Sequence, residues 1–78
     1  MSGESNVIRL MKQISKVVGT NVRKYRKKRG YTQEQLALYA NVGSYYLSRL
    51  ELGKENPTVA TLQKICSVLR IEITRLFD

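Results

Sequence analysis

Several kinds of functional site are missing from this sequence. It has no histidine and no tryptophan, one proline and one cysteine, Cys66. Without imidazole groups there is no histidine-based catalysis or metal ligation, and a lone cysteine forms neither an internal disulfide nor a cysteine-rich zinc site. The carboxylates show no metal or acid–base spacing. The sequence therefore favours a non-enzymatic protein without a metal or other cofactor, and it indicates no small-molecule ligand.

Two further absences concern location. No apolar run approaches the roughly 18–20 residues that span a bilayer. Residues 2–5, Ser-Gly-Glu-Ser, lack the basic and apolar blocks of a signal peptide. A single thiol is typical of a reducing compartment. We therefore expect a cytoplasmic protein.

Size and charge narrow the function further. The 78 residues are enough for one small domain. Fourteen lysines and arginines against six acids give a formal charge of +8. Such an excess attracts polyanions, nucleic acid first and an anionic membrane second.

The first third of the chain has a helical pattern. Apolar residues recur in steps of four and three at Val7, Met11, Ile14, Val18, Val22 and Tyr25. The pattern predicts a helix that reaches about Arg29. Gly19 either costs this helix roughly 1 kcal/mol relative to alanine or separates an arm from the first helix of the domain. A basic run (residues 23–29) ends the segment with six cations in seven positions, and such a run is usually a solvated face.

Cap residues divide the remainder into short helices. Thr32 and Gln35 form a capping box for a helix over 33–40, and Asn41 tolerates the left-handed backbone of a tight turn. A helix over 44–52 follows, then one after the N-cap Thr58 that runs to about 69, and a last one over 72–77. No segment shows strand alternation. The sequence predicts an all-α fold with five helices.

The helix over 44–52 has two different faces. Leu47 and Leu50 project to an apolar back, whereas the front carries the hydrogen-bonding side chains of Ser44, Tyr45, Ser48 and Arg49. A short helix and a turn come before it. This is the arrangement of a helix-turn-helix, whose second helix packs by its back and enters the DNA major groove by its front.

The motifs in this region resemble a known family. The run Gly30-Tyr-Thr-Gln-Glu-Gln-Leu-Ala37, followed by Tyr46-Leu-Ser-Arg-Leu-Glu-Leu-Gly-Lys-Glu-Asn-Pro57, is similar to the Cro/phage-repressor (Xre) helix-turn-helix family. The resemblance covers about residues 17–77. It implies a compact five-helix bundle like the lambda-repressor DNA-binding domain over residues 14–78, with residues 1–13 as a partly helical arm. A restriction–modification controller or a small phage or plasmid repressor is the branch we expect.

The resemblance also implies roles for individual residues. It places base reading on Ser44, Tyr45, Ser48 and Arg49. It places phosphate binding on Gln33, Tyr46 and Lys54, and a structural salt bridge between Arg26 and Glu51. The chain departs from the family at Gly43, where serine is usual, so either the helix is weakly capped or Ser44 caps it. It departs again at Leu52, where a polar or basic residue is usual.

Other conspicuous residues have structural interpretations. Tyr25 and Tyr31 take inward positions and are expected in the core. Cys66 lies on the apolar stripe of its helix and is expected to be a small core residue.

The resulting hypothesis is a homodimeric, sequence-specific regulator of transcription that binds double-stranded DNA, most simply a repressor or autoregulator. A single short helix reads about half a site, so this class usually binds paired half-sites as a dimer. Val68, Ile71 and Ile73 are the expected dimer contact, with Val7–Met11 as a second contribution. The alternative is an antitoxin-like or anti-repressor module whose main partner is a protein. A membrane-surface helix ranks third, since the arm has no tryptophan and only modest charge.

Overall fold

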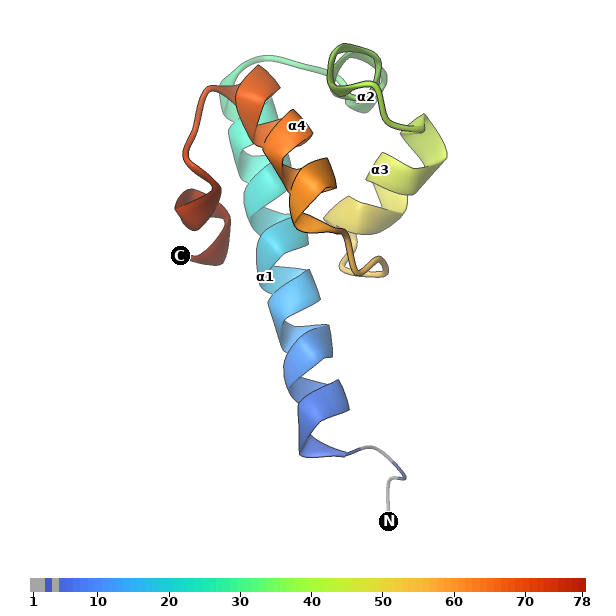
Figure 1. The fold of residues 1–78 in the computed structure, drawn as a ribbon. Helices are drawn as coiled ribbons and strands as arrows, with labels where there is room; N and C mark the ends of the chain where they lie inside the picture. Colours follow the sequence, from blue (N-terminus) through green and yellow to red (C-terminus); the bar gives the residue numbers. More distant parts are fainter. Residues whose placement is uncertain (1–2, 4) are drawn as a thin grey trace.

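The computed structural model describes residue 3 and residues 5–78, so part of the arm expected at residues 1–13 lies outside it. The described residues form four α-helices and one 3-10 helix, and none of them is in a strand. The elements are α1 (Asn6–Lys28), α2 (Gln33–Ala40), α3 (Ser44–Glu51), α4 (Val59–Leu69) and η1 (Ile73–Phe77). Figure 1 shows α2, α3, α4 and η1 gathered around the C-terminal half of α1, whose N-terminal half extends beyond them.

The all-α prediction is confirmed for the described residues, but the prediction of five helices is wrong. The last segment is a 3-10 helix of five residues with Glu72 as its N-cap. Arg70 takes left-handed backbone, with φ 57°, and ends α4. The tighter 3-10 turn suits a short piece such as this one.

Of the two alternatives that Gly19 left open, the structure has the first, one continuous helix. The Ser5 hydroxyl caps α1 by accepting a hydrogen bond from the Ile8 amide at 3.1 Å. The helix then runs through Gly19 without a break. A Cβ at this position would collide with the Leu50 carbonyl oxygen and lie 2.9 Å from that of Glu51. Glycine is therefore required here because the end of α3 lies against the backbone of α1.

The core draws on every element. Its buried apolar side chains are Val18, Val22, Leu36, Ala37, Ala40, Leu47, Leu50, Leu62, Ile65, Cys66, Leu69 and Leu76. The predicted core position of Cys66 is confirmed, and burial raises the pKa of its thiol. Tyr25 and Tyr31 are partly buried and pack against the core.

Two polar side chains, one in α1 and one at its C-cap, hold the C-terminal part of the chain. Asn21 is buried and its Nδ2 donates to the carbonyl oxygens of Leu76 at 2.9 Å and Asp78 at 3.2 Å. Arg29 donates through Nε to the Leu69 carbonyl at 2.8 Å. The second contact satisfies one of the carbonyls that the end of α4 leaves without a helical partner.

We expect Gly19→Ala to destabilise the protein although alanine is the better helix former. The obstacle is the backbone of α3, so relief requires α1 and α3 to move apart, at a cost of about 1–3 kcal/mol. Urea denaturation of the two proteins measures the difference. Thr20→Ala is the matched control, because Thr20 is exposed on the same helix. An increase in stability for Gly19→Ala would show that the close approach is not required.

Candidate nucleic-acid interface

The N-terminus of α2 is built by local hydrogen bonds. The Thr32 hydroxyl accepts from the Gln35 amide at 3.1 Å, and the Gln35 side chain accepts from the Thr32 amide at 2.9 Å. This is the predicted capping box. It fixes the start of α2 and thereby places the side chain of Gln33, the first residue of the helix.

A short turn joins α2 to α3. Asn41 takes left-handed backbone, with φ 55° and ψ 50°, as its residue type allows. The Val42 amide donates to the Ala37 carbonyl at 2.9 Å and closes the end of α2. Gly43 then occupies the N-cap of α3 with no side-chain hydrogen bond. Of the two alternatives at this position, the weakly capped helix is the one observed, and Ser44 lies inside α3.

The faces of α3 separate as the projection predicted. Leu47 and Leu50 are fully buried, whereas Ser44 and Tyr45 are exposed, Tyr45 by 76%. Ser48 and Arg49 are half-buried. Leu52, the unusual apolar residue, is exposed at the C-cap of α3.

Behind this face lies a buried ion pair. Arg26 donates through Nε and Nη2 to the two carboxylate oxygens of Glu51, at 2.7 and 2.9 Å. The side chains are only 10% and 2% exposed, so the structure brings this expected pair together in the interior. Nη1 of Arg26 donates to the Tyr31 carbonyl at 2.9 Å. Within the described residues no buried side-chain nitrogen or oxygen lacks a partner, as a buried charge requires.

The ion pair also reaches α2. Nε2 of Gln33 donates to Oε1 of Glu51 at 3.0 Å. A primary amide carries two N–H groups, so the second remains for a ligand at the surface. Gln33 is thereby oriented by the same carboxylate that ties α1 to α3.

A second ion pair lies at the exposed end of α3. Arg49 donates through Nε to Oε2 of Glu55 at 2.7 Å and through Nη2 to the Lys54 carbonyl at 3.1 Å. The Glu55 carboxylate raises the pKa of the Arg49 guanidinium. Glu55 was not among the predicted site residues. Its signal was weak: an acid two residues after the glycine that ends the helix.

The other two expected phosphate ligands differ in exposure. Lys54 is exposed in the loop after α3. Tyr46 is half-buried and packs against the core. Burial, and next the nearby Glu55 carboxylate, raise the pKa of the Tyr46 phenol, while a hydrogen bond with Thr61 acts in the opposite direction.

Several side chains of the basic run (residues 23–29) make contacts within the protein. Arg26 and Arg29 are engaged within the protein, as described above. Lys24 and Lys28 place their Nζ atoms 5.4 and 5.9 Å from the centre of the Tyr25 ring. The run therefore contributes structure at two positions and a positive field at the others.

Two features are absent from the described residues. No helix among them is both long and apolar enough to cross a bilayer. No group of three or more histidine, cysteine, aspartate and glutamate side chains is gathered there as a metal site would need.

Comparison with known proteins identifies the family. The helix-turn-helix family HTH_3 matches residues 22–76, more than half of the chain. The transcriptional regulator SlrR of Bacillus subtilis is 43% identical over 63 residues, which cover 80% of this chain and 41% of SlrR. The chain thus spans about two-fifths of the length of this relative. The protein belongs to the helix-turn-helix family, and its relatives confirm the resemblance to repressors of the Xre type.

Solved structures share the fold. The restriction–modification controller C.AhdI of Aeromonas hydrophila superposes with a TM-score of 0.78 at 28% identity, covering 81% of this chain and 96% of that one. The biofilm regulator SinR, solved in complex with DNA, superposes with a TM-score of 0.75 at 35% identity, covering 78% of this chain and 98% of that one. The first is named a controller protein and the second a master regulator for biofilm formation.

We expect removal of the buried carboxylate to be severely destabilising. Glu51→Ala leaves the charge of Arg26 buried without its partner, which costs about 3–5 kcal/mol of unfolding free energy. Urea denaturation followed by circular dichroism measures the loss. Glu55→Ala is the control, because the Arg49–Glu55 pair lies at the surface, where ion pairs contribute little to stability. Equal losses in the two variants would contradict a special role for the buried pair.

Proposed function

We propose that this protein is a sequence-specific regulator of transcription that inserts the segment 44–52, α3 with its C-cap, into the major groove of double-stranded DNA. The observation that carries the proposal is the division of α3 into a buried apolar back and an accessible polar front. A helix fixed by its back to a rigid scaffold presents its front at a set angle, as groove reading requires. Family membership and the SinR–DNA complex support the same assignment.

The front of α3 supplies groups suited to base edges. The guanidinium of Arg49 can engage O6 and N7 of a guanine together. Ser44 and Ser48 offer hydroxyls that donate or accept. Tyr45, the most exposed of the four, offers a hydroxyl and a ring face for a thymine methyl group.

Phosphate contacts would flank these base contacts. Gln33 can offer its second amide N–H together with the first backbone N–H groups of α2, which have no helical partner. Lys54 extends from the loop at the other end of α3. Tyr46 can contribute only its hydroxyl, because its ring is packed against the core.

We further propose that the protein binds DNA as a homodimer, located in the cytoplasm, and acts as a repressor or autoregulator by occupying its operator. The predicted dimer contact, Val68, Ile71 and Ile73, is partly buried against the core, so its free apolar surface is modest. Further exposed apolar side chains lie on the projecting part of α1, for example Leu10, 55% exposed. Pairing of the two surfaces between copies would cover both.

Arg49→Ala tests base reading. Anisotropy titrations would use duplexes selected from a random pool and single-base variants of the selected site. We expect the selected site to lose about 1–3 kcal/mol of binding free energy. Discrimination between bases should be lost at one position of each half-site and kept at the others. The loss arises because alanine offers no hydrogen-bond donors to the guanine edge.

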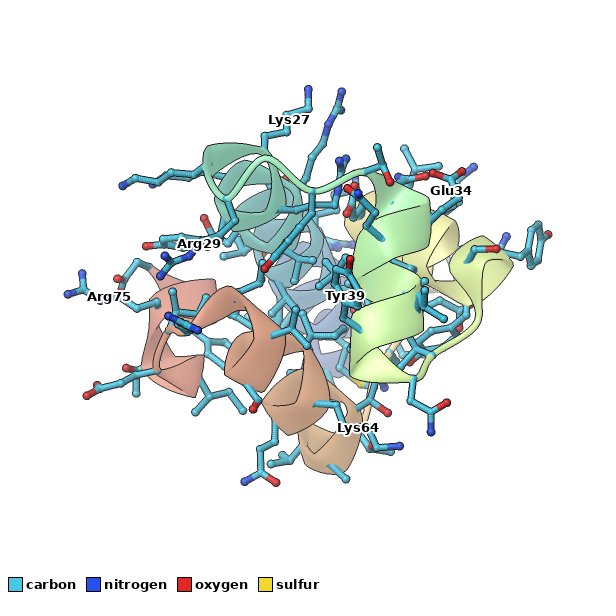
Figure 2. The ribbon with its side chains drawn as sticks, turned by 90° about the horizontal axis from the view of Figure 1, so that it is seen from above. Lys27, Arg29, Glu34, Tyr39, Lys64 and Arg75 are labelled. Atoms are coloured by element: carbon cyan, nitrogen blue, oxygen red, sulfur yellow. The ribbon has the colours of Figure 1, made fainter. Side chains whose placement is uncertain are left out.

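Arg75→Ala is the matched control for charge. Figure 2 shows Arg75 on the opposite side of the molecule from Glu34, which lies in the first turn of α2, while Lys27 points away from the body. The control should weaken binding to all duplexes by a similar small factor. If both variants behave alike and binding depends only on salt, the +8 charge alone explains it and base reading by Arg49 is wrong.

Leu10→Glu and Val68→Glu test the dimer. We expect each to raise the dimer dissociation constant about tenfold or more, because a buried unpaired carboxylate costs several kcal/mol at an interface. Sedimentation equilibrium measures the constant, and thermal melting checks that each variant is folded. A wild-type protein that stays monomeric on its selected palindrome would overturn the homodimer.

One observation favours a second candidate function. The exposed apolar face of the projecting α1 segment would suit a module whose main partner is another protein, in the manner of an antitoxin or anti-repressor. In that case Arg49→Ala would leave the principal interaction unchanged.

A further inference from the structure

The guanidinium of Arg49 is held on one side by the loop that follows α3. Glu55 accepts from Nε and the Lys54 carbonyl accepts from Nη2. The two side chains of the ion pair are 37% and 28% exposed, so both lie at the surface. Arg49 is therefore oriented before any ligand arrives.

The loop that carries Glu55 is itself fixed to α3. The Gly53 amide donates to the Leu50 carbonyl at 3.0 Å, and the Lys54 amide donates to the Arg49 carbonyl at 2.9 Å. Gly53 has φ 75°, and a Cβ there would lie 2.9 Å from the Cα of Lys16. The path of the loop thus depends on a residue without a side chain, and it places Glu55 beside Arg49.

The occupied donors limit how Arg49 can bind a base. Arginine has five N–H groups in a fixed planar fork. Nε donates to Glu55 and Nη2 to the Lys54 carbonyl, and a hydrogen bond with the Tyr45 side chain also involves the guanidinium. A guanine needs two parallel donors, which the edge formed by Nη1 and Nη2 can provide.

We propose that Glu55 is a specificity-determining positioning residue, which holds Arg49 with its Nη1–Nη2 edge toward the groove and keeps it from serving as a general phosphate contact. The inference rests on the proposed function, in which Arg49 reads a base. Orientation favours the correct site because less side-chain freedom is lost on binding. The negative charge disfavours the unspecific complex, in which a flexible arginine would pair with any phosphate.

Glu55→Ala separates these effects from simple loss of stability. Binding to random duplex should become tighter by a few-fold. The slope of log K against log salt concentration should become steeper, by an amount equivalent to up to about one further released counterion. Discrimination at the base position assigned through Arg49→Ala should fall about tenfold, which corresponds to about 1.4 kcal/mol. A merely structural residue would weaken both kinds of binding together.

Two further variants complete the design. Glu55→Gln keeps an oxygen acceptor for Arg49 and removes the charge, so it should tighten unspecific binding while retaining most of the discrimination. Glu72→Ala removes an exposed acid at the N-cap of η1 and controls for net charge. It should tighten binding to all duplexes slightly and leave discrimination unchanged.

The double variant Arg49→Ala/Glu55→Ala, compared with the two single variants, distinguishes base reading by Arg49 from positioning by Glu55. Its discrimination between bases should equal that of Arg49→Ala alone, because the proposed effect of Glu55 on base discrimination passes through Arg49. If Arg49→Ala itself leaves discrimination intact, base reading by Arg49 fails and the role of Glu55 fails with it. If Arg49→Ala removes discrimination but Glu55→Ala preserves it, only the positioning role is overturned.

Discussion

The buried ion pair between Arg26 and Glu51 is the interaction on which the arrangement of the interface depends. It joins α1 to the last residue of α3, and through Gln33 it also orients the start of α2. An apolar pair of similar volume can match such a pair in stability. It would not reproduce the hydrogen bonds that align three helices at one point. The value of this pair therefore lies in geometry, since the angle of α3 on its scaffold sets what its front can reach.

Close contact between backbones makes this geometry possible. The carbonyls of Leu50 and Glu51 lie against Gly19, and the loop at Gly53 lies against Lys16, so α3 is held to α1 on both sides of its C-terminus. Glycine in mid-helix lowers helix stability by about 1 kcal/mol. The surrounding contacts offset this cost, and the N-terminal part of α1 remains helical beyond them.

Local signals in the sequence predicted most of the fold. The capping box, the N-cap threonine, the left-handed Asn41 and apolar spacing act over a few residues, and they located the four α-helices. The role of Gly19 was left open because it depends on an element some thirty positions away. The Arg26–Glu51 pair was expected only through family resemblance, and composition gave no sign of it. Glu55 was missed because its proximity to Arg49 results from the path of a loop, which no periodic pattern describes.

The two ion pairs of α3 illustrate two different uses of a carboxylate in a basic protein. A formal charge of +8 gives attraction to any nucleic acid, and this attraction carries no sequence information. Discrimination must come from groups whose freedom is restricted. Glu51, in the interior, restricts the helix as a body, whereas Glu55, at the surface, restricts one side chain on it. In the role proposed for Arg49, the negative charge of Glu55 beside it would lower unspecific affinity and narrow the ways in which Arg49 can bind. The position of each acid would then matter more to the selectivity of DNA binding than the number of cations does.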